Sequence, residues 1–198
     1  MSIECGCPEI LAPLPDIETD RLTLRRFYKE DASLLEPIFA KPEVWMFPYG
    51  RGFTRGETEL FLQAQIEEWS NCGLGCWLAI RKSNGQAIGY VGISILHFMP
   101  EILPTVEVGW RFDPDVWGQG YATEGASAAL SEAFTTLGLN KVCSAPQSGN
   151  PSSWRVCERL GMSRERLATA GGTPKRGPVE VALYWITKNE WLDRQRMS

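Results

Sequence analysis

Hydrophobic and polar residues alternate with a period of two in several short segments of this chain, the pattern of half-buried β-strands. Two β-rich runs, GCWLAIR and QAIGYVGISIL, are separated by three residues that include Asn84-Gly85, the strongest short signal for a hairpin. They are therefore expected to pair as antiparallel strands. The other runs with strand character are RLTLRRF, TVEVGWRF, KVCSAP, MSRERLA and VEVALYWIT.

Helical signals lie between these strands. A capping box of Thr54 and Glu57 opens a helix that runs to Trp69 and is ended by Asn71 and Gly73. The other expected helices cover residues 31–39, 121–137, 151–160 and a short segment after residue 187. This order predicts an α/β fold of the α+β type, with a mixed, mostly antiparallel sheet of six to seven strands flanked by helices.

The domain organisation follows from length and composition. A chain of 198 residues with 43% apolar and 22% charged residues is typical of one soluble globular domain. Three prolines and no sustained period mark residues 1–17 as an N-terminal arm. We expect residues 18–198 to form a single domain.

Charge and cysteine content narrow the class of partner. A net charge of −4 provides no broad positive field, so neither nucleic acid nor a membrane surface is expected as a partner. The start of the chain has no secretion signal, and no run of 18 apolar residues occurs, which favours a cytoplasmic protein. Six irregularly spaced cysteines and the single histidine, His97, indicate reduced thiols and no metal site.

The most informative stretch joins the strand TVEVGWRF to a helix through Trp117-Gly118-Gln119-Gly120-Tyr121-Ala122. Two glycines at a strand-to-helix junction let the backbone approach a ligand closely, and the first helical turn offers free N–H groups to an anion. A pyrophosphate fits such a site. A dinucleotide turn needs a third glycine earlier than Gly125, within a βαβ unit, so a nicotinamide-dependent redox enzyme is disfavoured.

Four motifs in this order resemble the GNAT superfamily of acetyltransferases, in the RimJ/RimL-like branch. They are ETDRLTLRRF, KPEVWMFPYGRGFTRGETELFL, GWRFDPDVWGQGYATEG and NPSSWRVCERLGM. The third is similar to the family's acetyl-CoA-binding motif and the fourth to its N-x-x-S-x-x-V-x-E helix. The resemblance covers about residues 18–190 and implies an acyl-CoA-dependent N-acetyltransferase with a sheet splayed at its fourth strand.

The resemblance also implies which residues bind acetyl-CoA. The backbone of Trp110, Arg111 and Phe112 would bind the pantetheine arm, and the N–H groups of residues 117–122 would hold the pyrophosphate. Asn150 would contact the CoA chain, although it is also a good helix N-cap. Ser153, one turn later, would donate a proton to the departing thiolate, or would be an ordinary residue of the first turn.

Two positions depart from the family pattern. Asp115 stands where Gln or Arg often precedes the glycines, and because an acid cannot donate to phosphate, binding would rest on the backbone and the helix dipole. In related enzymes of the RimI branch a tyrosine near the end of the second motif acts as the general acid, and the resemblance implies that Cys157 occupies the equivalent position. We interpret it as a packed thiol rather than as the proton donor.

Glu107 is the candidate general base. Strand alternation places it opposite Val106 and Val108, facing the expected cleft, where a carboxylate can take the proton of an attacking amine. Candidate residues of the acceptor pocket are the aromatic side chains Trp45, Phe47 and Tyr49. The expected reaction is acetyl transfer from acetyl-CoA to a primary amine, either a protein N-terminal α-amine or a small-molecule amine.

The alternative hypothesis is that the chain has the same fold but is a non-catalytic acyl-CoA-binding regulatory module. Glu107 beside an intact Gly-x-Gly turn and Asn150 favours the enzyme. The other interpretation of Glu107 is that its carboxylate is simply exposed to solvent or forms an ion pair with an arginine. The expected assembly is a monomer or a homodimer.

Overall fold

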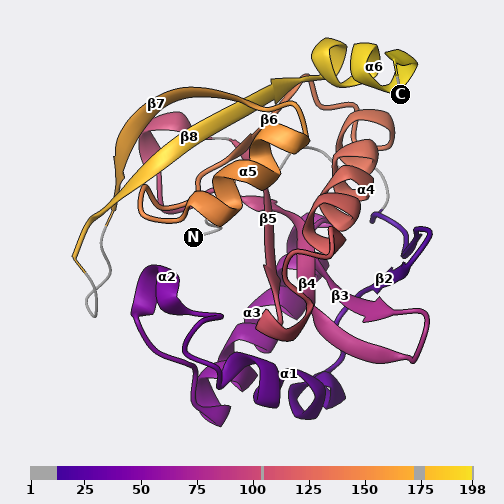
Figure 1. Ribbon diagram of the computed structural model, residues 1–198, viewed down its shortest axis with the longest axis vertical. Coiled ribbons are helices and arrows are strands. Elements are labelled where there is room, and N and C mark those ends of the chain that lie inside the picture. The colour runs from indigo at the N-terminus through magenta and orange to yellow at the C-terminus, as the bar shows by residue number, and fades with distance from the viewer. Residues whose placement is uncertain (1–12, 104, 172–176, 198) are drawn as a thin grey trace.

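The computed structural model describes residues 13–103, 105–171 and 177–197, which form one mixed β-sheet covered by helices (Figure 1). Its eight strands lie in the order β1-β2-β3-β4-β5-β6-β8-β7, and every neighbouring pair is antiparallel except β5 and β6. The predicted α/β architecture is confirmed. The strands are β1 (Ile17–Glu18), β2 (Leu22–Arg25), β3 (Cys76–Arg81), β4 (Gln86–Ile95), β5 (Val106–Phe112), β6 (Lys141–Ser144), β7 (Ser163–Ala170) and β8 (Val179–Thr187).

The sheet has one strand more than the six or seven expected. The additional strand is β1, which pairs with β2 through Ile17 and Leu24. A strand of two residues is too short to show any period, which is why the sequence did not reveal it. Within the predicted N-terminal arm, residues 1–12 lie outside the described part, whereas Leu14 is fully buried and its N–H donates to the carbonyl of Gly73 at 3.0 Å.

The helices begin and end close to the predicted residues. In α3, the Thr54 hydroxyl accepts from the N–H of Glu57, and the Glu57 carboxylate accepts from the N–H of Thr54. Gly73, with φ +66°, is the C-cap that ends this helix, as predicted, and the helix continues past Trp69 to Cys72. The short helix α2 was not predicted. The helices are α1 (Ala32–Phe39), α2 (Met46–Tyr49), α3 (Arg55–Cys72), α4 (Tyr121–Thr135), α5 (Pro151–Arg159) and α6 (Lys188–Met197).

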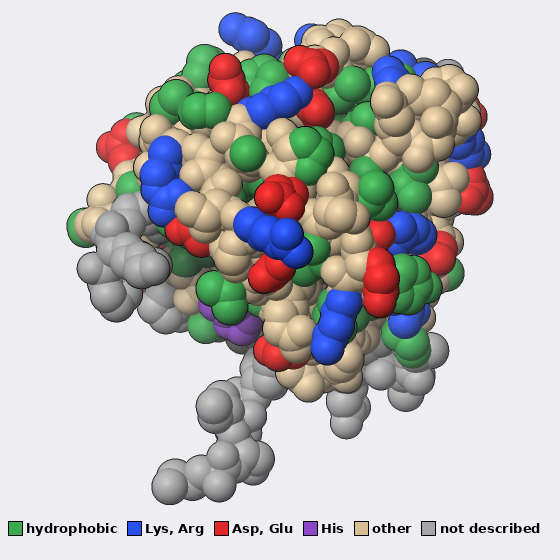
Figure 2. Space-filling view, turned by 90° about the horizontal axis from the view of Figure 1, so that it is seen from below, with side chains coloured by type: hydrophobic (Ala, Val, Ile, Leu, Met, Phe, Trp, Pro, Cys, Tyr) green, Lys and Arg blue, Asp and Glu red, His purple; other side chains and the backbone are tan. Residues whose placement is uncertain are grey.

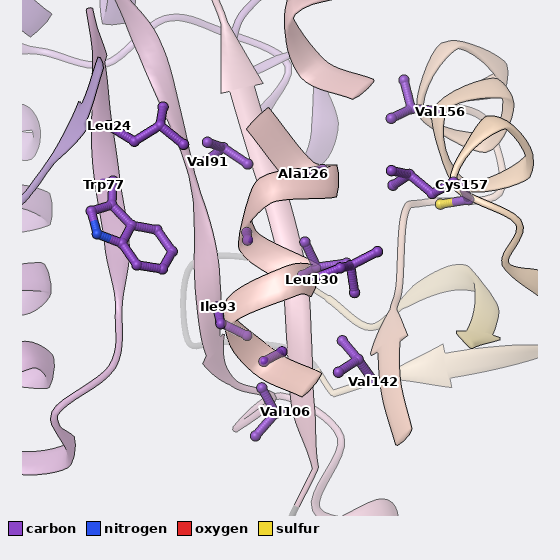
Figure 3. Close-up of a cluster of buried hydrophobic side chains, with 14 of the residues drawn as sticks. Leu24, Trp77, Val91, Ile93, Val106, Ala126, Leu130, Val142, Val156 and Cys157 are labelled. Carbon is purple, nitrogen blue, oxygen red and sulfur yellow. The ribbon is translucent and has the colours of Figure 1, made fainter. Parts of the chain in front are cut away.

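The two faces of the sheet carry different helices. Helix α4 packs on β4 and β5, and Figure 3 shows its Ala126 and Leu130 beside Val91 and Ile93 of β4. Helices α1 and α3 contribute a second cluster with Leu78 on the opposite face. Because side chains alternate along a strand, the burial of Val106 and Val108 with α4 directs the intervening residue, Glu107, to the other face, as predicted.

Strands β5 and β6 separate along their length. All seven residues of β5 pair with β4, but β5 meets β6 only through Glu107 and Cys143. Beyond Glu107, the edge of β5 that faces β6 therefore has no strand partner within the described residues. The fourth of the predicted strands, TVEVGWRF, is β5, and the expected splay is found at this strand.

Cysteine chemistry differs in part from the expectation. Cys72, at the end of α3, is disulfide-bonded, so the expectation that all six cysteines are reduced is wrong for this residue. Cys76, Cys143 and Cys157 are free and buried. These three pack as small apolar side chains.

The surface shows no strong preference for either sign of charge where it is drawn. Figure 2 shows Lys and Arg side chains interspersed with Asp and Glu over the face it presents. Within the described ranges, no helix is long and apolar enough to cross a membrane. In the same part of the chain, no three His, Cys, Asp or Glu residues gather as metal ligands would.

Candidate active site

Two hollows meet where β5 separates from β6. The first, here called the groove, has a volume of about 560 Å³, and the second, here called the pocket, about 390 Å³. Both are within the size range of ligand sites in proteins. Because five residues line both hollows, a ligand in one would come close to a ligand in the other. These shared residues are Phe47, Trp110, Arg111, Asn150 and Ser153.

The groove collects nearly all of the residues predicted to bind the cosubstrate. Gln119 is the exception, because it does not line the groove. Its side-chain amide donates to the carbonyl of Asp115 at 3.3 Å. The predicted residues that do line the groove are Trp110, Arg111, Phe112, Trp117, Gly118, Gly120, Tyr121, Ala122 and Asn150.

The loop between β5 and α4 has the geometry of an anion site. Gly118 and Gly120 have φ values of +75° and +86°, in the left-handed region that favours glycine. A β-carbon added at Gly118 would meet nothing within 4 Å, so the space in front of the loop is open. Gly120 is the N-cap of α4 and supplies no side-chain cap, which leaves the first-turn N–H groups available to a negatively charged ligand.

Arg21 fixes this loop to the other end of the chain. Its guanidinium lies 2.6 Å from the carboxylate of Glu124 in α4 and donates to the carbonyl of Gln119 at 2.9 Å. It also lies over the ring of Tyr121, 4.5 Å from its centroid. The Thr19 hydroxyl donates to the same carboxylate at 2.6 Å. In the sequence, Arg21 is marked only as part of a strand-like run, because its partners lie about a hundred positions away.

Asp115, the departure from the family pattern, has a local partner. The ammonium group of Lys41 lies 2.6 Å from the Asp113 carboxylate and 2.8 Å from that of Asp115. Lys41 thereby joins the end of α1 to the turn that precedes the glycines. Its cation offsets the negative charge that Asp115 brings near the groove. No spacing in the sequence indicates this ion pair.

Glu107 lies in the pocket, partly buried, on the strand that also lines the groove. Burial raises the pKa of Glu107 to about 8; a hydrogen bond donated by Ser94 at 3.4 Å opposes this change, the Glu68 carboxylate adds to it and Arg111 opposes it. A carboxyl group with a pKa near 8 exchanges a proton readily close to neutral pH. This property suits a group that accepts a proton from an amine.

Glu68 of α3 is a further residue near the site, and no motif in the sequence indicates it. Its carboxylate accepts a hydrogen bond from the N–H of Ile95 at 3.2 Å, and burial raises its pKa. Ile95 follows Ser94, which donates to Glu107. Glu68 thus supports the strand segment opposite Glu107 and adds a second negative charge on that side of the sheet.

The three predicted aromatic residues form one wall of the pocket. Trp45 is buried and stacks on Phe53, with ring centroids 3.7 Å apart. Tyr49 lies 5.9 Å from Trp45 and is 44% exposed, so it is the outermost of the three. Phe47 lines both hollows, which places it at their junction.

The side chain of Arg111 holds this wall against the sheet. It donates to the carbonyls of Val44 and of Phe47, the latter at 2.8 Å. Its guanidinium lies over the ring of Trp45 at 3.9 Å, a cation–π contact. The resemblance implied a backbone role for Arg111, and the geometry adds this structural role for its side chain.

The start of α5 brings the remaining candidates to the junction. Asn150 is the N-cap, and its side-chain oxygen accepts from the N–H of Ser153 at 3.2 Å. Both residues line both hollows. Cys157 is fully buried in the core (Figure 3), and burial raises the pKa of its thiol to about 12. The thiol thus lies outside both hollows, and the interpretation of Cys157 as a packed residue agrees with this position.

Comparisons with known proteins agree with this geometry. The FsC-acetyl coenzyme A-N(2)-transacetylase of Aspergillus fumigatus is 32% identical over 197 residues, which cover 93% of this chain and 81% of the relative. The crystal structure of an acetyltransferase from Agrobacterium tumefaciens has a TM-score of 0.71 and 26% identity, and covers 87% of this chain and 94% of its own.

A further solved structure shares the fold. It is the ribosomal α-N-protein acetyltransferase RimL in complex with coenzyme A, with a TM-score of 0.70 and 14% identity, covering 85% of this chain and 95% of its own. Residues 21–163 match the family model described as an acetyltransferase (GNAT) domain. The chain therefore belongs to the GNAT family and is an acyl-CoA-dependent N-acetyltransferase.

Proposed function

We propose that this N-acetyltransferase transfers the acetyl group of acetyl-CoA to a primary amine of a small molecule, with Glu107 as the general base. The observation that carries the proposal is the meeting of the groove and the pocket beside β5. A thioester entering from the groove and an amine entering from the pocket would come together within reach of Glu107.

The groove residues suit each part of the cosubstrate. The edge of β5 near Trp110, Arg111 and Phe112 has no strand partner in the described part of the chain and offers backbone groups to the amides of pantetheine. The carbonyl of Phe112 already accepts from the indole N–H of Trp117 at 2.8 Å. The loop of residues 117–122 offers N–H groups and the positive end of α4 to the pyrophosphate. Asn150 stands where the two hollows join and would contact the CoA chain.

The proposed reaction is a direct transfer. Glu107 takes a proton from the ammonium form of the acceptor, and the neutral amine attacks the thioester carbonyl. Backbone N–H groups stabilise the oxyanion of the tetrahedral intermediate. The C–N bond forms, the C–S bond breaks, and Ser153 donates a proton to the thiolate. The acceptor nitrogen loses its second proton, which restores the hydroxyl of Ser153, and is left as a neutral amide. The proton held by Glu107 is released to solvent.

The pocket favours a small amine with an apolar body. Aromatic side chains make one wall, and the guanidinium of Arg111 is already occupied by carbonyl groups and Trp45. Glu107 is left to attract the ammonium group. An α-amine with a pKa of about 7.7–8.0 needs less help to become neutral than a lysine-like amine near 10.4. The name of the 32% identical relative, which describes transfer to an N(2) nitrogen, supports an amine of this class.

A protein N-terminal α-amine is the second candidate acceptor. The printed name of RimL describes such an activity, but the likeness at 14% identity carries the fold alone. The same base and the same groove would serve this reaction. The exposed position of Tyr49 at the outer end of the aromatic wall leaves the pocket entrance accessible to a peptide.

The test is a mass-spectrometric screen of acceptors with acetyl-CoA, using a library of small amines and a set of short peptides with free N-termini. We expect thiol release together with an acetylated small amine. Acetylation of peptides alone would favour the second candidate. Acetyl-CoA binding without thiol release above hydrolysis for any acceptor would favour the non-catalytic acyl-CoA-binding module.

Replacing Arg21 by Met is expected to weaken acetyl-CoA binding about threefold to tenfold, because the loop loses its ion pair and its hydrogen bond to Gln119. The turnover number at saturating acetyl-CoA should change little, since Arg21 lies outside the pocket. Calorimetric titration with CoA and steady-state kinetics would measure the two effects.

The matched control is Arg55→Met, which removes an exposed ion pair with Glu59 on α3, away from both hollows. It should leave CoA affinity unchanged. Glu124→Gln should reproduce the effect of Arg21→Met, and the double variant should lose little more, because the two residues act as one unit. Equal affinities of Arg21→Met and wild type would contradict the role of this network.

A further inference from the structure

We infer that Arg155 and Arg159 of α5 form a binding site for a phosphate monoester at the outer end of the groove. The ligand group is the 3′-phosphate on the ribose of CoA. The inference rests on the proposed placement of acetyl-CoA in the groove and adds a specificity element to it. The two arginines would distinguish CoA from nucleotide thioesters that lack this phosphate.

The first observation is that both arginines line the groove and that, in the part of the chain that the structure describes, their side chains have no partner. Both are exposed, and within the described residues neither guanidinium makes an ion pair or a hydrogen bond. Most other arginines near the site are occupied, as Arg21 is by Glu124 and Arg111 by carbonyl groups. Two free guanidinium groups on one wall are therefore available to an anion.

The second observation is their spacing. Residues four apart in a helix lie on the same face, so Arg155 and Arg159 project in the same direction. Arg159 lies six positions after Ser153, which corresponds to about 9 Å along the helix axis. The arginines thus lie towards the C-terminal end of α5, away from the junction with the pocket. The thioester would react at the opposite end of the helix, near Ser153.

The third observation concerns the charges of the groove itself. Among the residues that line the groove, Glu43 carries a carboxylate, and its side chain is exposed on the segment before α2. The N-terminus of α4 provides for the pyrophosphate through backbone groups. A second phosphate group on the same ligand needs separate donors, and the arginine pair supplies them. Arginine suits this purpose because its planar donors match phosphate oxygens.

The experiment compares acetyl-CoA with 3′-dephospho-acetyl-CoA, two ligands that differ only in this phosphate. Calorimetric titrations would use the full chain as wild type, Arg155→Met, Arg159→Met and the double variant. Arg196→Met is the control, since it removes one exposed arginine of α6 that does not line the groove. Thermal unfolding would confirm that every variant is folded.

We expect wild type to bind acetyl-CoA about tenfold or more tightly than the dephospho form, with the difference decreasing as salt is raised. Each single variant should lose about threefold to tenfold in affinity for acetyl-CoA and little for the dephospho form. The double variant should bind both forms alike, and Arg196→Met should behave as wild type.

Two results would overturn the inference: equal binding of both ligands by wild type, or unchanged discrimination in the double variant. Neither would affect the proposed function, because acetyl transfer could proceed from either ligand. A failure of wild type to bind acetyl-CoA at all would instead refute the placement of the cosubstrate, and the arginine site with it.

Discussion

Glu107→Gln is expected to lower kcat/KM for the amine acceptor about 10²–10⁴-fold, the usual contribution of a positioned general base. Glutamine has nearly the same shape, and the hydrogen bond from Ser94 can be kept through the amide oxygen. The affinity for acetyl-CoA should remain close to that of wild type, because Glu107 lines the pocket and not the groove. Steady-state kinetics with the acceptor found in the screen would measure the loss.

The pH dependence gives this prediction a second readout. The carboxylate is the form that accepts a proton, and it is populated above a pKa of about 8, so wild-type kcat/KM should rise as the pH rises through this value. The variant lacks this ionisation. The deficit of the variant should therefore grow as the pH rises through about 8 and should become smaller only at higher pH, where the acceptor is already neutral without a base.

The free energy of unfolding should decrease as the pH rises, whereas kcat/KM should increase. The pKa of Glu107 is raised on folding, so the folded chain binds more protons than the unfolded chain between about pH 4.5 and about pH 8. Stability contributed by the protonated carboxyl group is therefore lost as pH rises through this window. Denaturant unfolding of Glu107→Gln should show a weaker dependence on pH there than wild type.

Glu101→Gln is the matched control for the base assignment. Glu101 is an exposed carboxylate in the 3-10 turn before β5 and lines neither hollow. Its replacement should leave the kinetics unchanged. Near wild-type turnover of Glu107→Gln at pH 7, on the true acceptor, would refute the assignment and point to a water held by backbone carbonyls.

Most of the fold could be predicted because its signals are local. The Asn84-Gly85 turn and the capping box of Thr54 and Glu57 act within a few residues, and each specifies an element at its expected place. Strand alternation likewise directed Glu107 away from α4. These patterns depend on backbone preferences and on burial of one face, both of which can be read from the sequence.

The elements that escaped prediction depend on contacts with distant parts of the chain. Strand β1 is stabilised by pairing with β2, and its two residues carry no period of their own. Helix α2 contains Pro48, and Phe47 has non-helical dihedral angles, so no helical pattern marks it. Arg111, more than sixty positions away, donates to the carbonyl of Phe47 in this helix and to that of Val44 just before it.

The candidate site was predictable in its backbone and less so in its side-chain networks. The strand-to-helix junction with two glycines is a contiguous motif, and the residues at the start of α5 form another. By contrast, Arg21 reaches Glu124 across 103 positions and Lys41 reaches Asp113 across 72. Such ion pairs depend on tertiary structure, and no spacing in the sequence indicates them.

Gly120→Val is expected to weaken CoA binding about tenfold to a hundredfold. Gly120 has φ +86°, and a β-branched residue is strongly disfavoured there, so the loop would shift. An added β-carbon would also lie 3.4 Å from the guanidinium of Arg21, which holds the loop. Losing one or two charge-assisted hydrogen bonds from N–H groups to the pyrophosphate corresponds to a change of this size.

Gly138→Val separates this effect from general strain. Gly138 follows α4, has φ +66°, has open space around its added β-carbon and does not line the groove. Both variants should lose stability in thermal unfolding because both place a β-branched residue in the left-handed region. Only Gly120→Val should lose CoA affinity in calorimetry. Equal affinities of the two variants would show that the pyrophosphate does not bind at residues 117–122, since backbone strain alone would then account for every change at Gly120.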